Sequence, residues 1–349
     1  MSITSKPFGT TKLGQMVTAW TLKNSAGLSA VILNFGGVLL EMNTPDRDGR
    51  FANISCFYPD ISSYEDLRPF FGSLVGRYAN RIAKGKFVID GIEYDVPINN
   101  GENALHGGLR GFDQVIYDVK PLEDENGIRL TYTSPDGEEG YPGTLDLTVD
   151  YVLSNANELI IRYHAVTDKP TVLNLTNHTF WNLNGALGGN ILPTELTLYA
   201  SRYLAADTGL IPTGQYVDIA GTPLDFRRSK PIGRDIAGIT ESQFNGGYDH
   251  CYVLDKVAPG ELSLCAEAYD PRSGRTMAVS TTEPGAQLYT ANFVDGTTGV
   301  GDYKYQKHCA FCIEAQHYPD SPNHPEFPTT LLRPGEVYQQ VTSHQFGTR

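Results

Sequence analysis

Basic residues are few in this sequence, and none of them form a run. The 349 residues include 27 Lys and Arg against 40 Asp and Glu, which gives a formal net charge of −13 at pH 7. Proteins bind nucleic acids and other polyanions through clustered Lys and Arg side chains, so an acidic chain without such clusters is a poor polyanion binder. We therefore expect no nucleic-acid partner.

Long apolar stretches are also missing. A membrane-spanning helix needs about 20 predominantly apolar residues, whereas the longest apolar run here, residues 30–35, is short and is interrupted by Asn34. The N-terminal segment MSITSKPFGTTKLGQM lacks the apolar core of a secretory signal. We therefore expect a cytoplasmic protein that does not interact with a membrane.

Cysteine is scarce, and its spacing does not suggest a structural role. The five cysteines are scattered and odd in number, which is typical of reduced thiols. Cys309 and Cys312 have C-x-x-C spacing, but no second cysteine pair or histidine pair lies nearby to complete a four-ligand zinc site. We therefore expect no metal at these cysteines.

Helical periodicity is rare, and the chain instead alternates apolar and polar residues as β-strands do. In the clearest case, residues 86–96, Asp90 and Gly91 supply a tight turn between two β-forming runs. Two further alternating runs, 145–153 and 158–166, are joined by a turn at 154–157. Other predicted strands are 17–22, 28–35, 127–133, 194–200, 261–269, 276–280, 287–293 and 309–316, and a short helix is predicted at 62–68.

Evenly spaced strands without intervening helices favour an antiparallel all-β fold over alternating β–α–β units. The chain has no internal repeat, no linker rich in Pro or Ser, and no change of composition along its length. We expect residues 1–349 to form a single domain, a large antiparallel β-sandwich with few short helices.

Polar residues that interrupt apolar strand patterns are the candidates for function, because their burial costs free energy unless they are paired. Glu314 ends an apolar strand, and His178 lies between β-forming residues. His106 precedes two glycines, which allow close backbone approach. Arg81 offers a planar set of donors, and Asp249 follows a Gly-Gly turn. Each also has a structural interpretation in a polar network, a turn or an ion pair, so residue types alone indicate no more than an acid–base site.

The combination of motifs is more specific. In their order along nearly the whole chain, these motifs resemble those of the galactose mutarotase (aldose 1-epimerase) family. They are NFGG (34–37), GRYANRI (76–82), NALHGG (103–108), GYPG (140–143), NLTNHTFWNLNG (174–185), DFR (225–227), YDH (248–250), QLYTANF (287–293), EAQHYPDSPNHP (314–325) and RPGE (333–336).

The resemblance implies a β-sandwich of the galactose mutarotase-like type that interconverts the α and β anomers of a free aldohexose, such as D-galactose or D-glucose, without a metal or other cofactor. It implies that Glu314 is the general base and His178 the general acid. It further implies that the sugar is contacted by Asn80, Arg81, His106, Asp249 and Gln287. A Glu is ionised near neutral pH and a His can be held protonated by a nearby carboxylate, so the two residue types suit these roles, and the protonation state of His178 without sugar stays open.

Three other functions remain open at this stage. An epimerase for hexose 6-phosphates would need a cluster of basic residues, and 77–84 supply only two Arg and one Lys. A glycoside hydrolase would need two carboxylates, such as Glu314 with Asp249 or Asp320, and would leave His178 unexplained. A non-catalytic sugar-binding module would keep the sugar contacts but would not need both a Glu and a His. The preferred aldose, and whether the protein is a monomer or a homodimer, also stay open.

Overall fold

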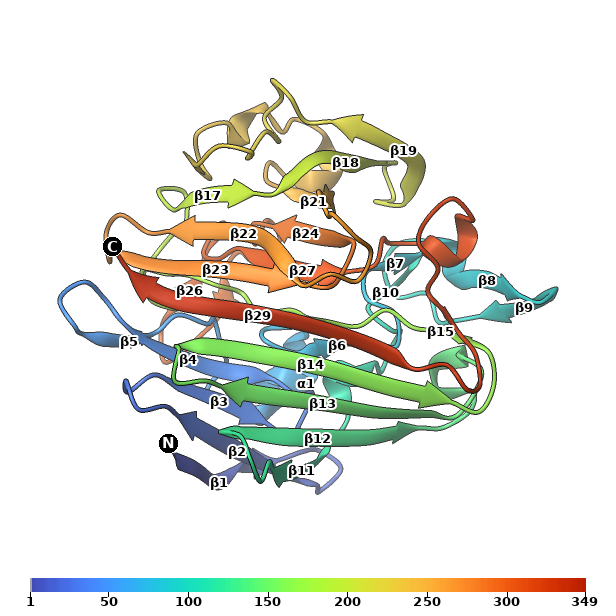
Figure 1. Cartoon of the computed structure of the whole chain (residues 1–349), viewed down its shortest axis with the longest axis horizontal. Coiled ribbons are helices and arrows are strands. Elements are labelled where there is room, and N and C mark those ends of the chain that lie inside the picture. The colour runs from blue at the N-terminus through green and yellow to red at the C-terminus, as the bar shows by residue number, and fades with distance from the viewer. Residues whose placement is uncertain (1) are drawn as a thin grey trace.

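The computed structural model describes residues 2–349, which are built mainly of antiparallel β-strands (Figure 1). The largest sheet has nine strands in the order β11-β12-β13-β14-β29-β23-β22-β17-β20, and each neighbouring pair is antiparallel. Its strands are β11 (Asp118–Pro121), β12 (Gly127–Ser134), β13 (Leu145–Leu153), β14 (Glu158–Thr167), β17 (Glu195–Leu198), β20 (Lys230–Pro231), β22 (Ser263–Tyr269), β23 (Arg275–Thr281) and β29 (Tyr338–Thr348).

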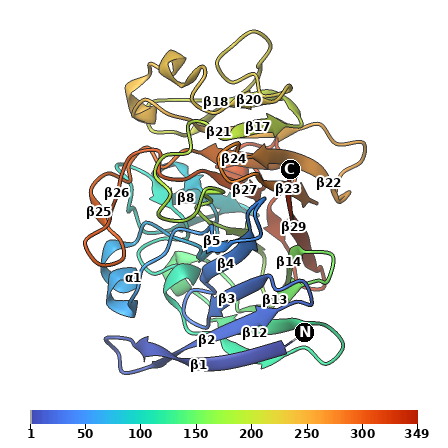
Figure 2. The same ribbon diagram turned by 90° about the vertical axis from the view of Figure 1, so that its left-hand side faces the viewer.

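Two five-stranded sheets form the second layer of the sandwich. Seen from the side, strands of these sheets lie to the left of β14, β23 and β29 (Figure 2). One sheet consists of β1 (Ser2–Thr10), β2 (Met16–Lys23), β3 (Ser29–Leu33), β4 (Leu39–Pro45) and β5 (Phe51–Asn53). The other, in the order β19-β18-β21-β24-β27, consists of β18 (Ala200–Ala206), β19 (Pro212–Asp218), β21 (Asp249–Leu254), β24 (Gly285–Tyr289) and β27 (Cys312–Gln316).

Short elements connect these sheets. The paired ones are β6 (Leu74–Val75) with β16 (Thr176–Asn177), β7 (Arg81–Ile82) with β10 (Ala104–Leu105), β8 (Lys86–Ile89) with β9 (Ile92–Asp95), β15 (Thr171–Val172) with β28 (Leu331–Leu332), and β25 (Thr297–Thr298) with β26 (Lys304–Tyr305). The α-helix α1 (Ile61–Leu67) begins at Asp60, whose side chain accepts a hydrogen bond from the Ser63 amide. Among the described residues, no helix combines the length and apolar character needed to cross a membrane.

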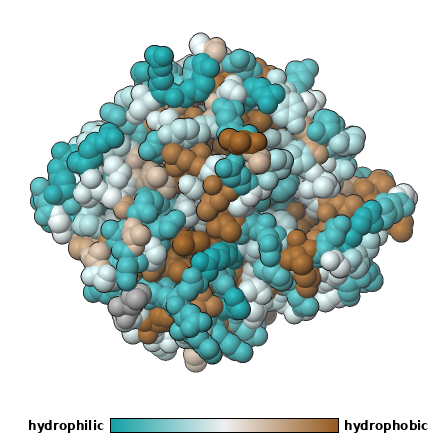
Figure 3. All heavy atoms as spheres, viewed as in Figure 1, coloured by the Kyte–Doolittle hydropathy of each residue, from teal (hydrophilic) through white to brown (hydrophobic). Residues whose placement is uncertain are grey.

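The main hydrophobic core lies between the two layers. Alternation along β13 buries Leu147, which shares one apolar cluster with Met42 of the first five-stranded sheet and Leu288 of the second. All three sheets therefore depend on the same core. The other side of the nine-stranded sheet faces solvent in part, and Figure 3 shows intermixed apolar and polar groups on the face viewed in Figure 1. A half-solvated antiparallel sheet of this kind is expected to alternate as β12 and β14 do.

The local sequence patterns predicted many strands correctly. Residues 86–96 form the β8–β9 hairpin, with Asp90 and Gly91 both at positive φ. The predicted runs 145–153 and 158–166 correspond to β13 and β14. The predicted helix at 62–68 is α1, shifted by one residue. All five cysteines are buried free thiols, as expected.

Other predictions of strand position were wrong. The predicted strand 287–293 ends at Tyr289, because the chain turns at 290–293 and Ala291 has a positive φ of 50°. Residues 194–200 are divided between β17 and β18. The longest strand, β29, was not predicted at all, although it lies between β14 and β23 near the middle of the large sheet. Its buried residues include Gln340, Thr342 and His344, so no apolar alternation marks it.

Candidate active site

Six of the seven predicted site residues line one cavity of about 1030 Å³. They come from β7 and the residue before it, from β21 and β27, and from the loops that follow β10 and β16. These residues are Asn80, Arg81, His106, His178, Asp249 and Glu314. Segments that are up to 234 positions apart in the sequence (80 to 314) thus meet at one place. The remaining predicted residue, Gln287, does not line the cavity within the described structure.

The proposed base and acid face each other. Glu314 is the third residue of β27 and lies opposite Gln287 of β24. His178 directly follows β16, and its backbone is fixed because its amide donates to the Ser73 carbonyl at 2.8 Å. His178 Nε2 lies 3.5 Å from Glu314 Oε1, and both side chains are almost fully buried. This separation is long for a hydrogen bond, and Glu314 Oε2 has no hydrogen-bond partner among the described residues. The carboxylate is therefore available to a ligand.

Aromatic rings enclose the His178 imidazole. It stacks on Phe180 with ring centroids 4.8 Å apart and lies nearly parallel to Phe70 at 6.0 Å. Tyr289 contacts it edge-on. Burial among these rings disfavours the charged form and lowers the pKa of His178 to about 3. The sequence left the protonation state of His178 open, and burial favours the neutral imidazole in the sugar-free site.

The charges in the cavity are unequal. The Arg81 guanidinium is buried near two carboxylates, Asp249 and Glu314. Burial, followed by repulsion from Asp249, raises the pKa of Glu314 well above its usual value, against the attraction of Arg81. Burial also raises the pKa of Asp249, against the effects of Arg81 and of a hydrogen bond from Gln287. One cation cannot fully compensate two buried anions, so the site favours a proton on a carboxyl group.

The position of the proton on His106 follows from its backbone contacts. The Asn80 amide donates to His106 Nδ1 at 3.1 Å, and the His106 amide donates to the Asn80 carbonyl at 2.9 Å. Since Nδ1 accepts a hydrogen bond, the proton of the neutral ring is on Nε2. Burial, together with the nearby Arg81 guanidinium, lowers the pKa of His106 well below its usual value, so the ring is neutral. His106 can therefore offer an Nε2–H donor to the cavity.

The same contact bears on metal binding. Ligand atoms of His106, His178 and Glu314 lie within 4.8 Å of one another, a set that resembles a two-His, one-carboxylate metal site. A metal-bound His uses a ring nitrogen lone pair and usually donates its other ring N–H to an acceptor. Here a donor, the Asn80 amide, faces His106 Nδ1. The neutral ring thus keeps no free lone pair for a metal, and this geometry disfavours a three-ligand centre.

Gln287 acts on the site through Asp249. Its side-chain nitrogen donates to Asp249 Oδ1 at 2.6 Å, and the two residues lie on neighbouring strands, β24 and β21. Gln287 is 4% exposed, and its Oε1 has no partner among the described residues. The amide therefore holds the Asp249 carboxylate in one orientation, and the direct sugar contact that the family resemblance implies for Gln287 stays a prediction.

Several cavity residues were missed by sequence reasoning. Phe70 stacks near both histidines, and Asp207 and Phe293 line the cavity from separate loops. Phe70 and Asp207 lie outside the motifs that carry the family resemblance, and Phe293 ends the QLYTANF motif (287–293) without a role of its own. Phe180 lines the cavity, whereas Trp181 packs in the main core.

Comparisons with known proteins agree with the fold and with the motifs. The model of the family "Aldose 1-epimerase" matches residues 18–345. The chain is 40% identical over 347 residues to galactose mutarotase of Rattus norvegicus, which covers 99% of both chains. It is 36% identical over 337 residues to aldose 1-epimerase of Escherichia coli (strain K12), covering 95% of this chain and 96% of that protein.

A solved structure gives the same result. The crystal structure of galactose 1-epimerase from Lactobacillus acidophilus NCFM superposes with a TM-score of 0.86 at 29% sequence identity, covering 100% of this chain and 99% of that one. The fold is thus a β-sandwich of the galactose mutarotase-like type. With a family match over almost its whole length and relatives of about 40% identity, this chain belongs to the aldose 1-epimerase family.

Proposed function

We propose that this protein is an aldose 1-epimerase (mutarotase) that interconverts the α and β anomers of a free aldohexose, with residues 1–349 acting as one domain. The observation that carries the proposal is the facing pair of Glu314 and His178, 3.5 Å apart in a cavity with space for a sugar. The relatives called galactose mutarotase and aldose 1-epimerase support the same activity.

The reaction needs one proton acceptor and one donor close together, because O1 and O5 of the sugar are both bonded to C1. Glu314 takes the proton of the C1 hydroxyl while His178 protonates the ring oxygen O5, and the C1–O5 bond opens. The aldehyde group then rotates about the C1–C2 bond. The reverse proton transfers close the ring on the other face of C1. Each positioned proton transfer typically contributes about 10² to 10⁴-fold to the rate.

In the reactive state, His178 is a protonated imidazolium and Glu314 is an ionised carboxylate. In the sugar-free site burial raises the pKa of Glu314 and lowers that of His178, so this proton resides mainly on the carboxyl group. The raised pKa makes the Glu314 carboxylate a stronger base, and the lowered pKa makes the His178 imidazolium a stronger acid. The shifts thus speed each transfer but reduce the population of the reactive form. The pair titrates as a unit with macroscopic pKa values.

The other polar residues orient the sugar. Arg81 and His106 Nε2–H are donors that can stabilise negative charge on a sugar oxygen. The Arg81 guanidinium is held by Asn100 Oδ1 at 3.1 Å and by Asn80 Oδ1 at 3.3 Å. Asp249 accepts hydrogen bonds from sugar hydroxyls in the orientation that Gln287 imposes. We propose that Asn80 acts mainly through Arg81 and the His106 ring.

The charge of the cavity favours an unphosphorylated sugar. Its lining contains three basic residues, Arg68, Arg81 and Lys84. The acidic residues of the lining number four, namely Glu102, Asp207, Asp249 and Glu314. Arg68 is also paired with Asp113 at 2.9 Å. A phosphate dianion requires a surplus of donors with positive charge, so hexose 6-phosphates should be poor substrates.

Polarimetry tests the proposal directly. Freshly dissolved α-D-galactose and α-D-glucose are followed to equilibrium with and without the protein, in the presence of EDTA. We expect faster relaxation to the same final rotation for at least one sugar. Unchanged relaxation for both would refute the proposed activity. A third arm with α-D-glucose 6-phosphate tests substrate class, and relaxation as fast as with glucose would show that the charge argument is wrong.

A further inference from the structure

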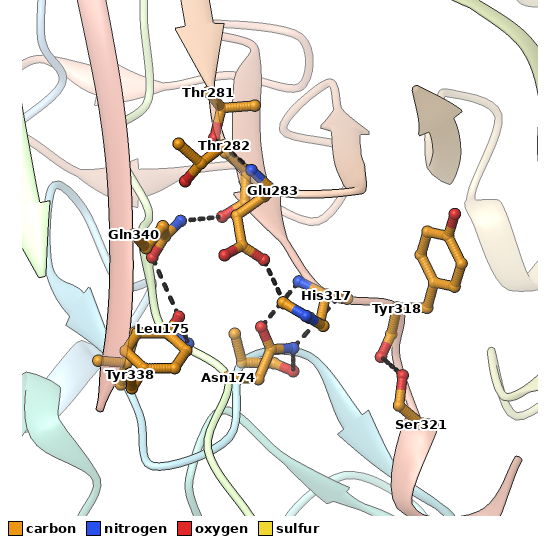
Figure 4. A network of polar contacts seen from close by, with 12 residues as sticks. Asn174, Leu175, Thr281, Thr282, Glu283, His317, Tyr318, Ser321, Tyr338 and Gln340 are labelled. Carbon is orange, nitrogen blue, oxygen red and sulfur yellow. Dashed lines mark hydrogen bonds and ion pairs between the residues drawn. The ribbon is translucent and has the colours of Figure 1, made fainter. Parts of the chain in front are cut away.

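A network of polar contacts joins chain segments that carry the site residues, although its own members do not line the cavity (Figure 4). Its centre is His317, three residues after Glu314 and just beyond the end of β27. Glu314 lines the cavity, whereas His317, which lies outside β27, does not. The residues considered below as the support network are Asn174, Glu283 and His317.

Asn174 joins three chain segments that carry site residues. Its side chain accepts a hydrogen bond from the His317 amide at 2.9 Å and donates to the His317 carbonyl at 3.2 Å. It also donates to the Ala79 carbonyl at 3.2 Å. Asn174 lies four residues before His178, and Ala79 directly precedes Asn80. One fully buried amide thus links the segments of the proposed acid, the proposed base and the Asn80–Arg81 pair.

The backbone of Asn174 strengthens one of these links. Its amide donates to the Arg77 carbonyl at 2.9 Å, and its carbonyl accepts from the Ala79 amide at 2.7 Å. The side chain and the main chain of this residue therefore both pair with residues 77–79. Such a buried and fully satisfied amide allows little relative movement of the strands that it joins.

Glu283 connects the network to a fourth segment. Its Oε2 lies 2.5 Å from His317 Nδ1, and the Glu283 side chain is 3% exposed. Glu283 is four residues before Gln287, the residue that orients Asp249. Burial lowers the pKa of His317, but the charge of Glu283 and its hydrogen bond outweigh burial, so the net shift is upward. The two residues therefore form an ion pair in which Glu283 is buried and His317 is partly exposed.

A second series of hydrogen bonds joins the segments that carry His178 and Glu314. The Leu175 amide donates to the Tyr338 hydroxyl at 3.3 Å, and that hydroxyl donates to Gln340 Oε1 at 3.2 Å. Gln340 Nε2 in turn donates to the Ala315 carbonyl at 3.2 Å. Ala315 is adjacent to Glu314, and Leu175 is three residues before His178. Tyr338 and Gln340 of strand β29 (Figure 4) thus support the segments that carry the proposed base and acid.

We propose that Asn174, Glu283 and His317 are positioning residues that set the separation of His178 and Glu314 and the orientation of Asp249. This inference rests on the proposed mutarotase function. None of the three residues lines the cavity, so they act through the segments that they join. Catalysis by a positioned pair is sensitive to small displacements, and a shift of about 1 Å can cost roughly 100-fold in rate.

The decisive variant is Asn174→Ala, with Asn24→Ala as its matched control. The Asn24 side chain is also buried, donates to Ser154 O and Asn157 Oδ1, and accepts from the Leu28 amide. It therefore makes the same number and kind of hydrogen bonds as Asn174, but none of its partners belongs to a site segment. Both variants should lose similar stability in urea unfolding.

We expect kcat of Asn174→Ala to fall about 10- to 100-fold, with KM changed less than about threefold, whereas Asn24→Ala keeps the wild-type kcat. Equal kcat values for the two variants would overturn the proposal. If Asn174→Ala does not fold, the pair Glu283→Gln and Glu283→Leu decides. Gln retains an acceptor for His317 Nδ1 and should keep kcat within about threefold, whereas Leu should lower kcat about tenfold. Equal activity of these two variants would also overturn it.

A readout without turnover separates this inference from the proposed function. The ring ¹⁵N chemical shifts of His178 report its surroundings in the sugar-free protein. We expect them to change in Asn174→Ala and to stay as in wild type in Asn24→Ala. An inactive wild type with this pattern of shifts would refute the mutarotase proposal alone. If the ring ¹⁵N shifts of His178 are unchanged in Asn174→Ala, the positioning role is refuted, whether or not the wild type is active.

Discussion

Glu314→Gln is the substitution that tests the proposed mechanism most directly. Gln keeps the shape of the side chain and one acceptor oxygen but cannot take a proton from the C1 hydroxyl. General-base catalysis is worth about 10² to 10⁴-fold, which corresponds to about 2.7 to 5.4 kcal/mol at 1.36 kcal/mol per tenfold change. Burial and Asp249 raise the pKa of Glu314, which makes it a stronger base than an ordinary carboxylate. We therefore expect the loss of kcat to lie in the upper half of this range.

No other carboxylate in the cavity is placed to substitute for Glu314. Asp249 Oδ1 accepts a hydrogen bond from Gln287 Nε2 at 2.6 Å. Among the described residues, the carboxylate that lies within ion-pair distance of His178 Nε2 is Glu314, not Asp249. KM should change less than about threefold, because the sugar hydroxyl contacts remain. Initial rates by polarimetry over a range of galactose concentrations separate the two parameters.

The stability of Glu314→Gln should stay close to that of the wild type. A carboxyl group whose pKa is raised on folding lowers the free energy of unfolding when it is ionised. This destabilisation is absent below the pKa of the unfolded state and grows as the pH rises. Glu314→Gln removes this destabilisation, but the new side-chain amide has an unpartnered N–H, which costs about 1–3 kcal/mol of stability. A suitable control is Asp270→Asn, which removes a fully buried carboxylate paired with Arg272 far from the cavity lining. This control should lose stability and keep kcat. Near-wild-type kcat in Glu314→Gln would refute the assignment of the base.

Three further predictions follow from the site. His178→Ala should lower kcat about 100-fold or more, measured by polarimetry, and a smaller effect than tenfold would contradict its role as the acid. Asp249→Asn should raise KM for galactose more than it lowers kcat, because the neutral side chain accepts sugar hydrogen bonds less strongly; a change in kcat alone would count against sugar binding. Stability to urea should decrease from pH 7 to pH 5, because burial lowers the pKa of His178, His250 and His344, so that the unfolded chain takes up protons that the folded chain does not. The raised pKa values of Glu314 and His317 act in the opposite direction, but these two groups are fewer than the three histidines. An unfolding midpoint that is constant over this range would contradict the pKa direction.

Strands were predictable where the local pattern alone determines them. The β8–β9 hairpin has alternating residues and a turn at Asp90 and Gly91, so neighbours in the sequence are also neighbours in space. Strand β29 is different, because its register is set by β14 and β23, which are distant in the sequence. Its buried Gln340 and His344 satisfy contacts that no local pattern reveals. Only the packed sheet determines that this polar segment is a central strand.

The candidate site was predictable in composition but less so in detail. The residues Glu314 and His178 are conspicuous because each interrupts an apolar pattern, and the family resemblance gives them roles. Their charge states were not predictable, because the pKa of His178 depends on Phe70, which lies more than a hundred positions away and shows no local signal. The orientation of Gln287 toward Asp249 likewise depends on the register of β24 with β21.

The opposite pKa shifts of the acid and the base have a common physical origin. Both groups are buried in the same cavity wall, where aromatic rings exclude water and Arg81 is the only cation close to both Asp249 and Glu314 among the described residues. Low polarity therefore disfavours the ionic form of each group, and one proton shared by the pair keeps both neutral. A sugar that donates its C1 hydroxyl to Glu314 and accepts at O5 from His178 stabilises the ionic form by hydrogen bonds on both sides. Substrate binding would thus create the reactive protonation state, and the 3.5 Å separation that makes this geometry accessible is the quantity that the support network controls.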